Sequence, residues 1–315
     1  MNFSVECAAF ADYPYTHMKF TWPAGTPTSS PVRLALRQSI LESIFLAESG
    51  HPGGSLSLVE ILTAIFDGNF QHSVDDQQNP ERDRLVLSKG HGVPALYAVY
   101  SLLGYFPAQE MSGLRSSGHF LQGHPDHLRF PLMEASTGSL GQGGSVALGL
   151  ALGLRVKFER GDLKRLPKVY CILGDGESQE GQVWECLMSC GKFLPGNLIF
   201  ILDANQGQLD GSVKEIMDLE PIPDKIKAFG LNMSEIDGHN VDVLKKKLAA
   251  IEIKAHAPAQ FIIARTQKGH GVKSMELNFD WHGKAPNKDE LKKALDELYS
   301  GSERPNGTLI EGGQA

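Results

Sequence analysis

Two short apolar runs, each followed by a polar side chain suited to binding a cation, constrain this chain most. Residues 169–173 and 198–202 are apolar almost throughout, which is typical of strands buried in a parallel sheet. Asp175 follows the first run and Asn205 follows the second, while the residues from Glu180 to Cys190 suit a connecting helix. Because parallel strands end at a common edge, this pattern predicts a strand–helix–strand unit with Asp175 and Asn205 at the edge where ligands bind.

Carboxylate and amide oxygens are ligands that Mg²⁺ accepts, usually together with phosphate and water. Gly174 and Gly176 flank Asp175 and would let the backbone pass close to an anion, and a helix after Gly176 would offer its N–H groups. A Gly-Asp-Gly turn followed by an unrelated Asx turn explains the same residues, so the rest of the chain must decide.

Composition places the chain among ordinary α/β proteins and excludes several classes. The 315 residues are 41% hydrophobic and 21% charged with a net charge of −7, so a strongly basic nucleic-acid face is not expected. No apolar run approaches the roughly 18 residues of a membrane span, and residues 1–22 lack the features of a secretory signal, so we expect a cytoplasmic protein that binds no membrane. The four cysteines show neither a disulfide framework nor a zinc spacing.

Helical and strand-like segments alternate along the chain. We expect helices near 31–49, 58–66, 93–103, 142–158 and 241–254, and further strands near 85–87, 231–236 and 261–265. This alternation predicts an α/β fold, a doubly wound, mainly parallel sheet with helices on both faces. Residues 1–30 are predicted to form an N-terminal arm, residues 31–300 the domain, and residues 301–315 a disordered tail.

Several of the eleven histidines lie beside glycine or proline in likely turns, among them His51, His91, His124 and His282. Such neighbours let imidazoles crowd around one ligand, where they can donate to phosphate or hydroxyl oxygens and transfer protons. A zinc cluster is the competing interpretation. Only His124 and His127 have a close ligand spacing, and the proline between them disfavours a helical pair.

Six segments, in order, resemble the diphosphate-binding half of transketolase, specifically the N-terminal subunit of the split, two-gene form. The resemblance covers residues 31 to 300. The six segments are Glu48 to Gly54, Leu87 to Gly92, Gly123 to Pro125, Thr137 to Gly143, Leu173 to Gly181 and Asp280 to Pro286.

The resemblance implies roles for individual residues. Mg²⁺, with Ca²⁺ or Mn²⁺ as substitutes, would be bound by Asp175, Asn205 and the carbonyl of Gly207. Catalysis would involve His51, His124 and His282, while Glu180 would join a carboxylate network between paired active sites. Thiamin diphosphate would contact His91, Gly138, Ser139, Leu140, Gly174, Asp175, Gly176, Glu177, Asn205, Leu209 and His282.

The implied function is reversible transfer of a two-carbon ketol unit from a ketose to an aldose, often as phosphates. Thiamin diphosphate supplies the nucleophile and electron sink, and histidines with pKa values near neutrality would move the protons. In this family the glutamate that activates the cofactor and the sugar-phosphate clamp lie in a pyrimidine-binding domain. The resemblance therefore implies a separate C-terminal partner subunit with that domain, in an α₂β₂ assembly, and no activity by this chain alone.

Other interpretations remain open. Ser139 stands where many transketolases have proline, and residues 53–57 also resemble deoxyxylulose phosphate synthases. The acceptor could be a specialised or nucleotide-linked sugar, and the chain could be a non-catalytic homologue. The alpha chain of a 2-oxo acid dehydrogenase uses the same cofactor, but the four histidine motifs favour transketolase. In residues 266–271, Lys268 is interpreted as structural.

Overall fold

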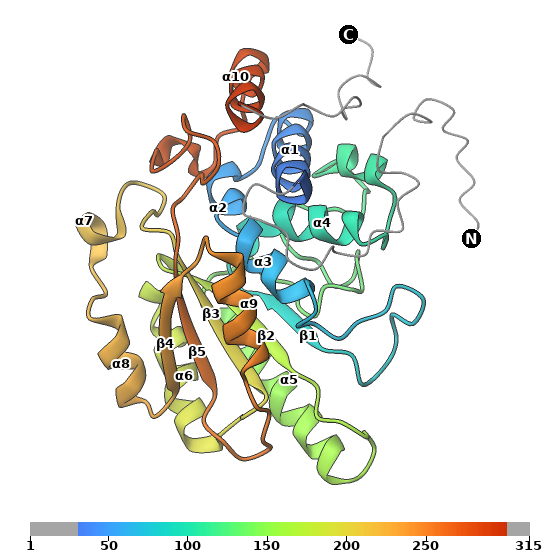
Figure 1. The fold of residues 1–315 in the computed structure, drawn as a ribbon, viewed down its shortest axis with the longest axis vertical. Helices are drawn as coiled ribbons and strands as arrows, with labels where there is room; N and C mark the ends of the chain where they lie inside the picture. The colour runs from blue at the N-terminus through green and yellow to red at the C-terminus, as the bar shows by residue number, and fades with distance from the viewer. Residues whose placement is uncertain (1–30, 301–315) are drawn as a thin grey trace.

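The computed structural model describes residues 31–300, so the predicted arm and tail lie outside the described residues. Five parallel strands form one sheet in the order β1-β2-β3-β5-β4 (Figure 1). The strands are β1 (Arg84–Leu87), β2 (Val169–Gly174), β3 (Leu198–Ala204), β4 (Asn232–Asp237) and β5 (Gln260–Arg265). The predicted parallel sheet is confirmed, and each predicted strand is present close to its expected position.

Helices precede the first strand, connect the strands and follow the last strand. They are α1 (Pro31–Leu46), α2 (Pro52–Leu56), α3 (Val59–Phe66), α4 (Val93–Leu102), α5 (Gln142–Glu159), α6 (Gly181–Phe193), α7 (Val213–Met217), α8 (Ile222–Ala228), α9 (Val241–Ala249) and α10 (Lys288–Leu298). The predicted helix 241–254 stops at Ala249, because the chain leaves the helix and packs Ile251 and Ile253 against the core instead. The predicted helix 31–49 stops at Leu46, before Glu48 takes a left-handed conformation.

Alternate residues of the sheet face two separate cores. On β2, Tyr170 and Ile172 pack with α1, α3, α4 and α9, whereas Cys171 and Leu173 pack with α5 and α6 on the opposite face. Helices therefore cover both faces, as the doubly wound fold requires (Figure 1). β4 is the exposed edge, and its residues are only partly buried.

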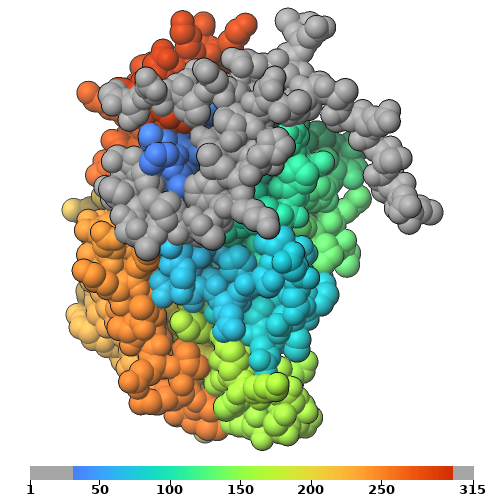
Figure 2. All heavy atoms as spheres, turned by 45° about the vertical axis from the view of Figure 1, so that its right-hand side comes forward, coloured from blue at the N-terminus to red at the C-terminus, as the bar shows by residue number. Residues whose placement is uncertain are grey.

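The segments around α3 and α9 lie side by side on one face of the molecule, although they are far apart in sequence (Figure 2). Helix α3 is largely apolar and every one of its residues is buried, including Glu60. The loops that follow β1, β2, β3 and β5 converge at the carboxyl edge of the sheet. No helix within residues 31–300 is long and apolar enough to cross a membrane.

Candidate active site

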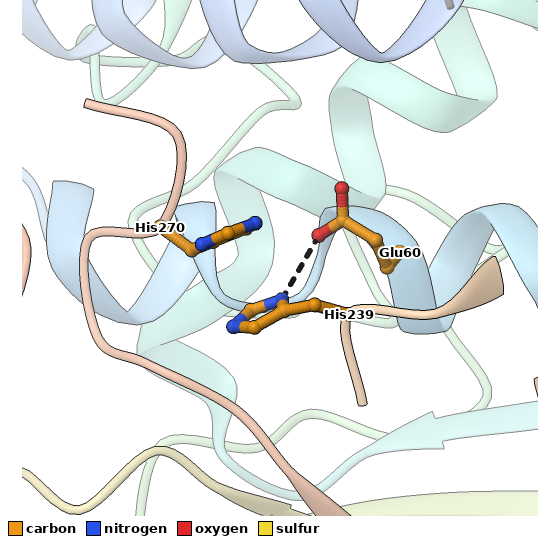
Figure 3. Close-up of side chains that lie close together, drawn as sticks. All are labelled: Glu60, His239 and His270. Carbon is orange, nitrogen blue, oxygen red and sulfur yellow. Dashed lines mark hydrogen bonds and ion pairs between the residues drawn. The ribbon is translucent and has the colours of Figure 1, made fainter. Parts of the chain in front are cut away.

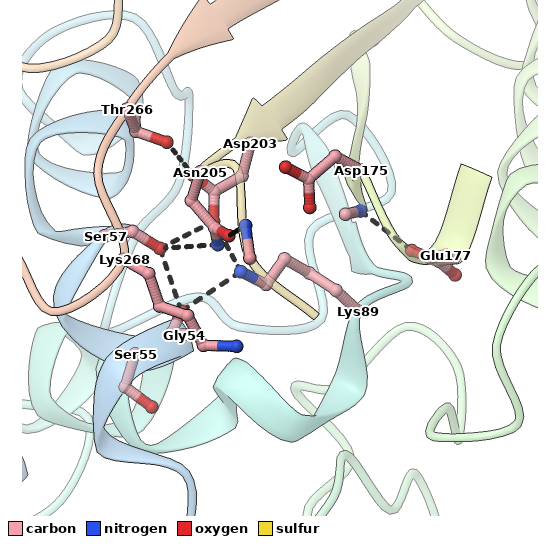
Figure 4. A network of polar contacts seen from close by, with 12 residues as sticks. Gly54, Ser55, Ser57, Lys89, Asp175, Glu177, Asp203, Asn205, Thr266 and Lys268 are labelled. Atoms are coloured by element: carbon pink, nitrogen blue, oxygen red, sulfur yellow. Dashed lines mark hydrogen bonds and ion pairs between the residues drawn. The ribbon is translucent and has the colours of Figure 1, made fainter. Parts of the chain in front are cut away.

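Asp175 and Asn205 lie at the ends of two adjacent strands, as the sequence pattern predicts. Gly174 on β2 pairs with Asp203 on β3, so the chain leaves the sheet at neighbouring points on the two strands. The Asp175 carboxylate accepts the backbone N–H of Gly176 at 2.9 Å and that of Gln206 at 2.6 Å, which ties the two loops to each other. Figure 4 shows this carboxylate directed toward the side of the site where Asp203 and Asn205 lie.

Asp175 occupies a place where an ionised carboxylate is poorly stabilised by the protein alone. It is 5% exposed, and burial, followed by the charge of Asp203, raises the pKa of Asp175 to about 7. The nearby ammonium of Lys89 offsets this only in part, because it forms a close ion pair with Asp203. A divalent cation beside Asp175 would supply the missing positive charge.

Two glycines at the site have too little room for a side chain. A Cβ atom on Gly176 would lie 3.0 Å from the Cβ of Gln208, and one on Gly54 would lie 3.0 Å from Nε2 of His91. A carboxylate, an amide oxygen and a carbonyl are hard oxygen donors of the kind Mg²⁺ takes together with phosphate. The residues present therefore fit a magnesium ion and a diphosphate.

The four predicted histidines come together from four separate segments. The ring centroid of His51 lies 5.4 Å from that of His91, 6.0 Å from that of His124 and 5.5 Å from that of His282. The rings of His91 and His282 are 5.3 Å apart. His51 is therefore the centre of the cluster, and its Nδ1 is buried without a hydrogen-bond partner within residues 31–300.

The pKa values of these histidines lie below the near-neutral values that their sequence context suggests. Burial, together with the charge of Arg115, lowers the pKa of His51 to about 4. Burial and the charge of Lys268 lower the pKa of His282 to about 3, and burial also lowers the pKa values of His91 and His124. The imidazoles are therefore neutral at pH 7 in this state, and an anionic ligand would raise their pKa values.

Lys268 belongs to this cluster, although its sequence context suggests a structural role. Its Nζ lies 2.7 Å from Nδ1 of His282 and 3.1 Å from the carbonyl of Gln208, to which it donates. Burial and the charge of Lys89 lower the pKa of Lys268 to about 8, so it remains mostly charged at pH 7. A charged donor at Nδ1 leaves the proton of His282 on Nε2.

The other predicted site residues differ in how deeply they are buried and in what they contact. Gly138 has a φ of +126°, and a Cβ atom there would lie 2.7 Å from Cδ2 of His124, whereas Ser139 is exposed and Leu140 is half-buried. Glu177 is buried, and its carboxylate accepts from Ser88, Gly141 and Gly174, so it joins three loops. Leu209 is 61% exposed on the loop after β3, and Glu180 is exposed at the start of α6.

A second cluster, Glu60, His239 and His270, was not found from the sequence (Figure 3). One ligand atom from each lies within 4.8 Å of the others, but Arg37 already pairs with Glu60 at 2.7 Å. Nε2 of His239 accepts the N–H of Gln267 at 2.7 Å, so its proton is on Nδ1, facing Glu60 at 3.3 Å. A metal ion bound at Nδ1 of His239 would leave the proton on Nε2, where it would oppose the N–H of Gln267. We therefore assign the cluster a structural role. His124 and His127, whose spacing is close but disfavoured as a zinc pair by the proline between them, are not part of any such cluster within the described residues.

Fold and site together define a domain that binds a diphosphate cofactor at the carboxyl edge of a parallel sheet. Residues 31–304 match the family model described as transketolase, thiamine diphosphate binding domain. The chain therefore belongs to the transketolase family, as its thiamine diphosphate-binding part. This result favours transketolase over the 2-oxo acid dehydrogenase interpretation.

Relatives with this domain alone and relatives with further domains both match. The chain is 41% identical over 267 residues to 6-deoxy-6-sulfo-D-fructose transketolase subunit SqwG of a Clostridium species, over 84% of this chain and 93% of that protein. It is 33% identical over 262 residues to an apulose-4-phosphate transketolase subunit of Phocaeicola vulgatus, over 83% of this chain and 90% of that one. The structure of transketolase from Campylobacter jejuni superposes with a TM-score of 0.79 at 30% identity, over 90% of this chain but only 44% of that chain.

Proposed function

We propose that this chain binds Mg²⁺ and the diphosphate of thiamin diphosphate and transfers a two-carbon ketol unit only together with a separate pyrimidine-domain subunit. The observation that carries the proposal is the buried Asp175 carboxylate, which is tied to the loop of Asn205 and whose pKa is raised to about 7 by burial and by Asp203. Asp175, Asn205 and the carbonyl of Gly207 are the proposed cation ligands.

The histidine cluster has a defined task in this proposal. Thiamin diphosphate, when bound, supplies the nucleophile and the electron sink for cleavage between C2 and C3 of the ketose. His282, protonated on Nε2, is suited to donate to a phosphate or hydroxyl oxygen, because Lys268 occupies its Nδ1. His51 and His124 are suited to accept and return the proton of the C3 hydroxyl, since a neutral imidazole is the protonation state that a base requires.

The two-subunit organisation is supported by the coverage of the relatives. Two proteins named as transketolase subunits are matched over 90% or more of their length. We propose the same organisation here, with residues 31–300 as the diphosphate domain and an α₂β₂ assembly in which Glu180 lies between paired sites. A cytoplasmic location stays a prediction from the sequence.

The same relatives support a proposal for the substrate class. One is named for a sulfonated ketose and the other for a sugar phosphate, so we propose a ketose with an anionic group at its far end. Nucleotide-linked acceptors and a non-catalytic role remain alternatives, and the intact ligand set of Asp175, Asn205 and the four histidines favours a catalytic subunit.

Reconstitution tests the proposal. Ketol transfer is measured for this chain by itself, for the chain with its cognate pyrimidine-domain partner, and for that partner by itself, with fructose 6-phosphate or 6-deoxy-6-sulfofructose as donor. We expect turnover only in the mixture, and a clear preference between the two donors defines the anionic group. Turnover by the single chain would refute the two-subunit proposal, and an inactive mixture that binds thiamin diphosphate would favour a non-catalytic homologue.

A further inference from the structure

The amide of Asn205 is bonded in one orientation by residues that would not themselves touch the cation. We infer that Asp203, together with Ser57, is a positioning residue that fixes the Asn205 amide with its nitrogen toward the protein and its oxygen toward the cation site. The inference rests on the magnesium site proposed above. It assigns a positioning role to Asp203, which lies near the proposed ligands Asp175 and Asn205.

Asp203 is unsuited to act as a cation ligand, because both of its oxygens are occupied (Figure 4). Its Oδ2 accepts the hydroxyl of Ser57 at 2.7 Å, the amide nitrogen of Asn205 at 3.0 Å and the ammonium of Lys89. Its Oδ1 accepts the hydroxyl of Thr266. All four partners are buried, so the carboxylate is enclosed by the protein and its negative charge is paired with groups inside the protein.

The Ser57 hydroxyl provides the second contact to the amide. Its single proton goes to the Asp203 carboxylate at 2.7 Å, which is a nearer and stronger acceptor than the Gly54 carbonyl at 3.3 Å. The Ser57 oxygen is then an acceptor for Nδ2 of Asn205 at 3.2 Å. Both protons of the Asn205 amide therefore have acceptors, Asp203 and Ser57.

The opposite orientation of the amide is excluded by the same contacts. It would set Oδ1 of Asn205 against a carboxylate oxygen and a hydroxyl oxygen that has already donated its proton. In the observed orientation Oδ1 accepts the N–H of Gly207 at 3.2 Å, on the side of the third proposed ligand. One lone pair of Oδ1 is therefore already available to a cation when no cation is bound.

The pairing of Asp203 with Lys89 also sets the charge of the site. It leaves one carboxylate, Asp175, among the proposed ligands, with two neutral oxygen donors. Mg²⁺ in such a site depends on phosphate oxygens for the rest of its coordination. The cation and the diphosphate should therefore bind together, each weakly without the other.

Two variants test the inference by measuring cation binding instead of activity. Free Mn²⁺ is followed by electron paramagnetic resonance in the presence of thiamin diphosphate, with the purified chain. Ser57→Ala removes one acceptor and should weaken Mn²⁺ binding about tenfold, and saturating Mn²⁺ should restore full binding of thiamin diphosphate. The matched control is Ser43→Ala, a buried hydroxyl that donates to the carbonyl of Ile40 in its own helix and should leave Mn²⁺ binding unchanged.

The second variant, Asn205→Asp, separates orientation from charge. A new carboxylate would strengthen cation binding if Asn205 supplied only an oxygen. The inference predicts binding at least about tenfold weaker, because the side chain loses both N–H donors and opposes Asp203. Thermal unfolding in EDTA checks that the variants fold.

Unchanged Mn²⁺ binding in Ser57→Ala, or equal or tighter binding in Asn205→Asp, would overturn the inference. Weak thiamin diphosphate binding by Ser57→Ala even at saturating Mn²⁺ would also overturn it, since the defect would then not pass through the cation. A wild-type chain that binds neither Mn²⁺ nor thiamin diphosphate would instead refute the proposed function.

Discussion

Replacing Lys268 by Met should change the protonation of His282 without unfolding the chain. Lys268 is buried, and its Nζ donates to Nδ1 of His282 at 2.7 Å, while its aliphatic carbons pack close to Gly207 and Gly53. Methionine keeps most of that apolar contact and removes the charge. The variant therefore isolates the effect of the ammonium on the imidazole.

The size of the effect follows from the contact. A hydrogen bond from a charged donor contributes about 1.5–3 kcal/mol, and about 1.4 kcal/mol corresponds to one pH unit, so the pKa of His282 should rise by roughly one to two pH units. Its direction follows from the lost positive charge, since Lys268 is the first neighbouring charge that lowers the pKa of His282. The tautomer should change as well, because the variant lacks the donor that favours an unprotonated Nδ1.

Nitrogen-15 NMR of the histidine side chains in the purified chain measures both quantities. We expect wild-type His282 to carry its proton on Nε2 at pH 7, and Lys268→Met to show a mixture of tautomers with a higher pKa. Lys284→Met is the matched control, because Lys284 lies two residues from His282 but pairs with Glu290. Identical titrations and tautomers in wild type and Lys268→Met would refute the assigned contact.

Two further predictions concern backbone packing and pH. Gly90→Ala places a Cβ 2.7 Å from the backbone nitrogen of Gly138 and should lower the free energy of unfolding in urea by about 1–3 kcal/mol. Gly181→Ala is the control, because its Cβ meets nothing within 4 Å and should not destabilise the chain. Equal stability of the two variants would contradict this packing. The pKa of His51 is about 4 folded and near 6.5 unfolded, so its stabilisation is lost as pH falls from 6.5 toward 4. His51→Gln should therefore flatten the fall in stability between pH 6.5 and 5 by up to about 2 kcal/mol, less solvent screening; an unchanged slope would contradict the shift.

Local patterns were enough to predict the sheet and the edge that carries the site. The apolar runs and the glycine-flanked Asp175 indicate where β2 and β3 end. Both signals lie within a few consecutive residues, so they can be recognised from the sequence. The helix after residue 241 was predicted too long, because Ile251 and Ile253 have an apolar spacing that continues the pattern but pack outside the helix. A periodic pattern alone does not show which residues leave the helix.

Contacts between distant segments could not be predicted in the same way. Lys268 meets His282 only through the loops after β5 and before α10, and Asp203 acts on Asn205 together with Ser57, which follows α2. The lowered pKa values of the histidines also depend on burial and on cations such as Arg115 that fold against them. Nothing in the local sequence of His51 carries that information.

Calorimetric titration of the purified chain with thiamin diphosphate tests the central claim most directly, namely that this chain holds the diphosphate through a cation at Asp175. We predict saturable binding in Mg²⁺, and its loss both in EDTA and in an Asp175→Ala variant that unfolds no earlier than wild type. Binding of equal strength in Mg²⁺ and in EDTA, or in Asp175→Ala and wild type, would contradict the account.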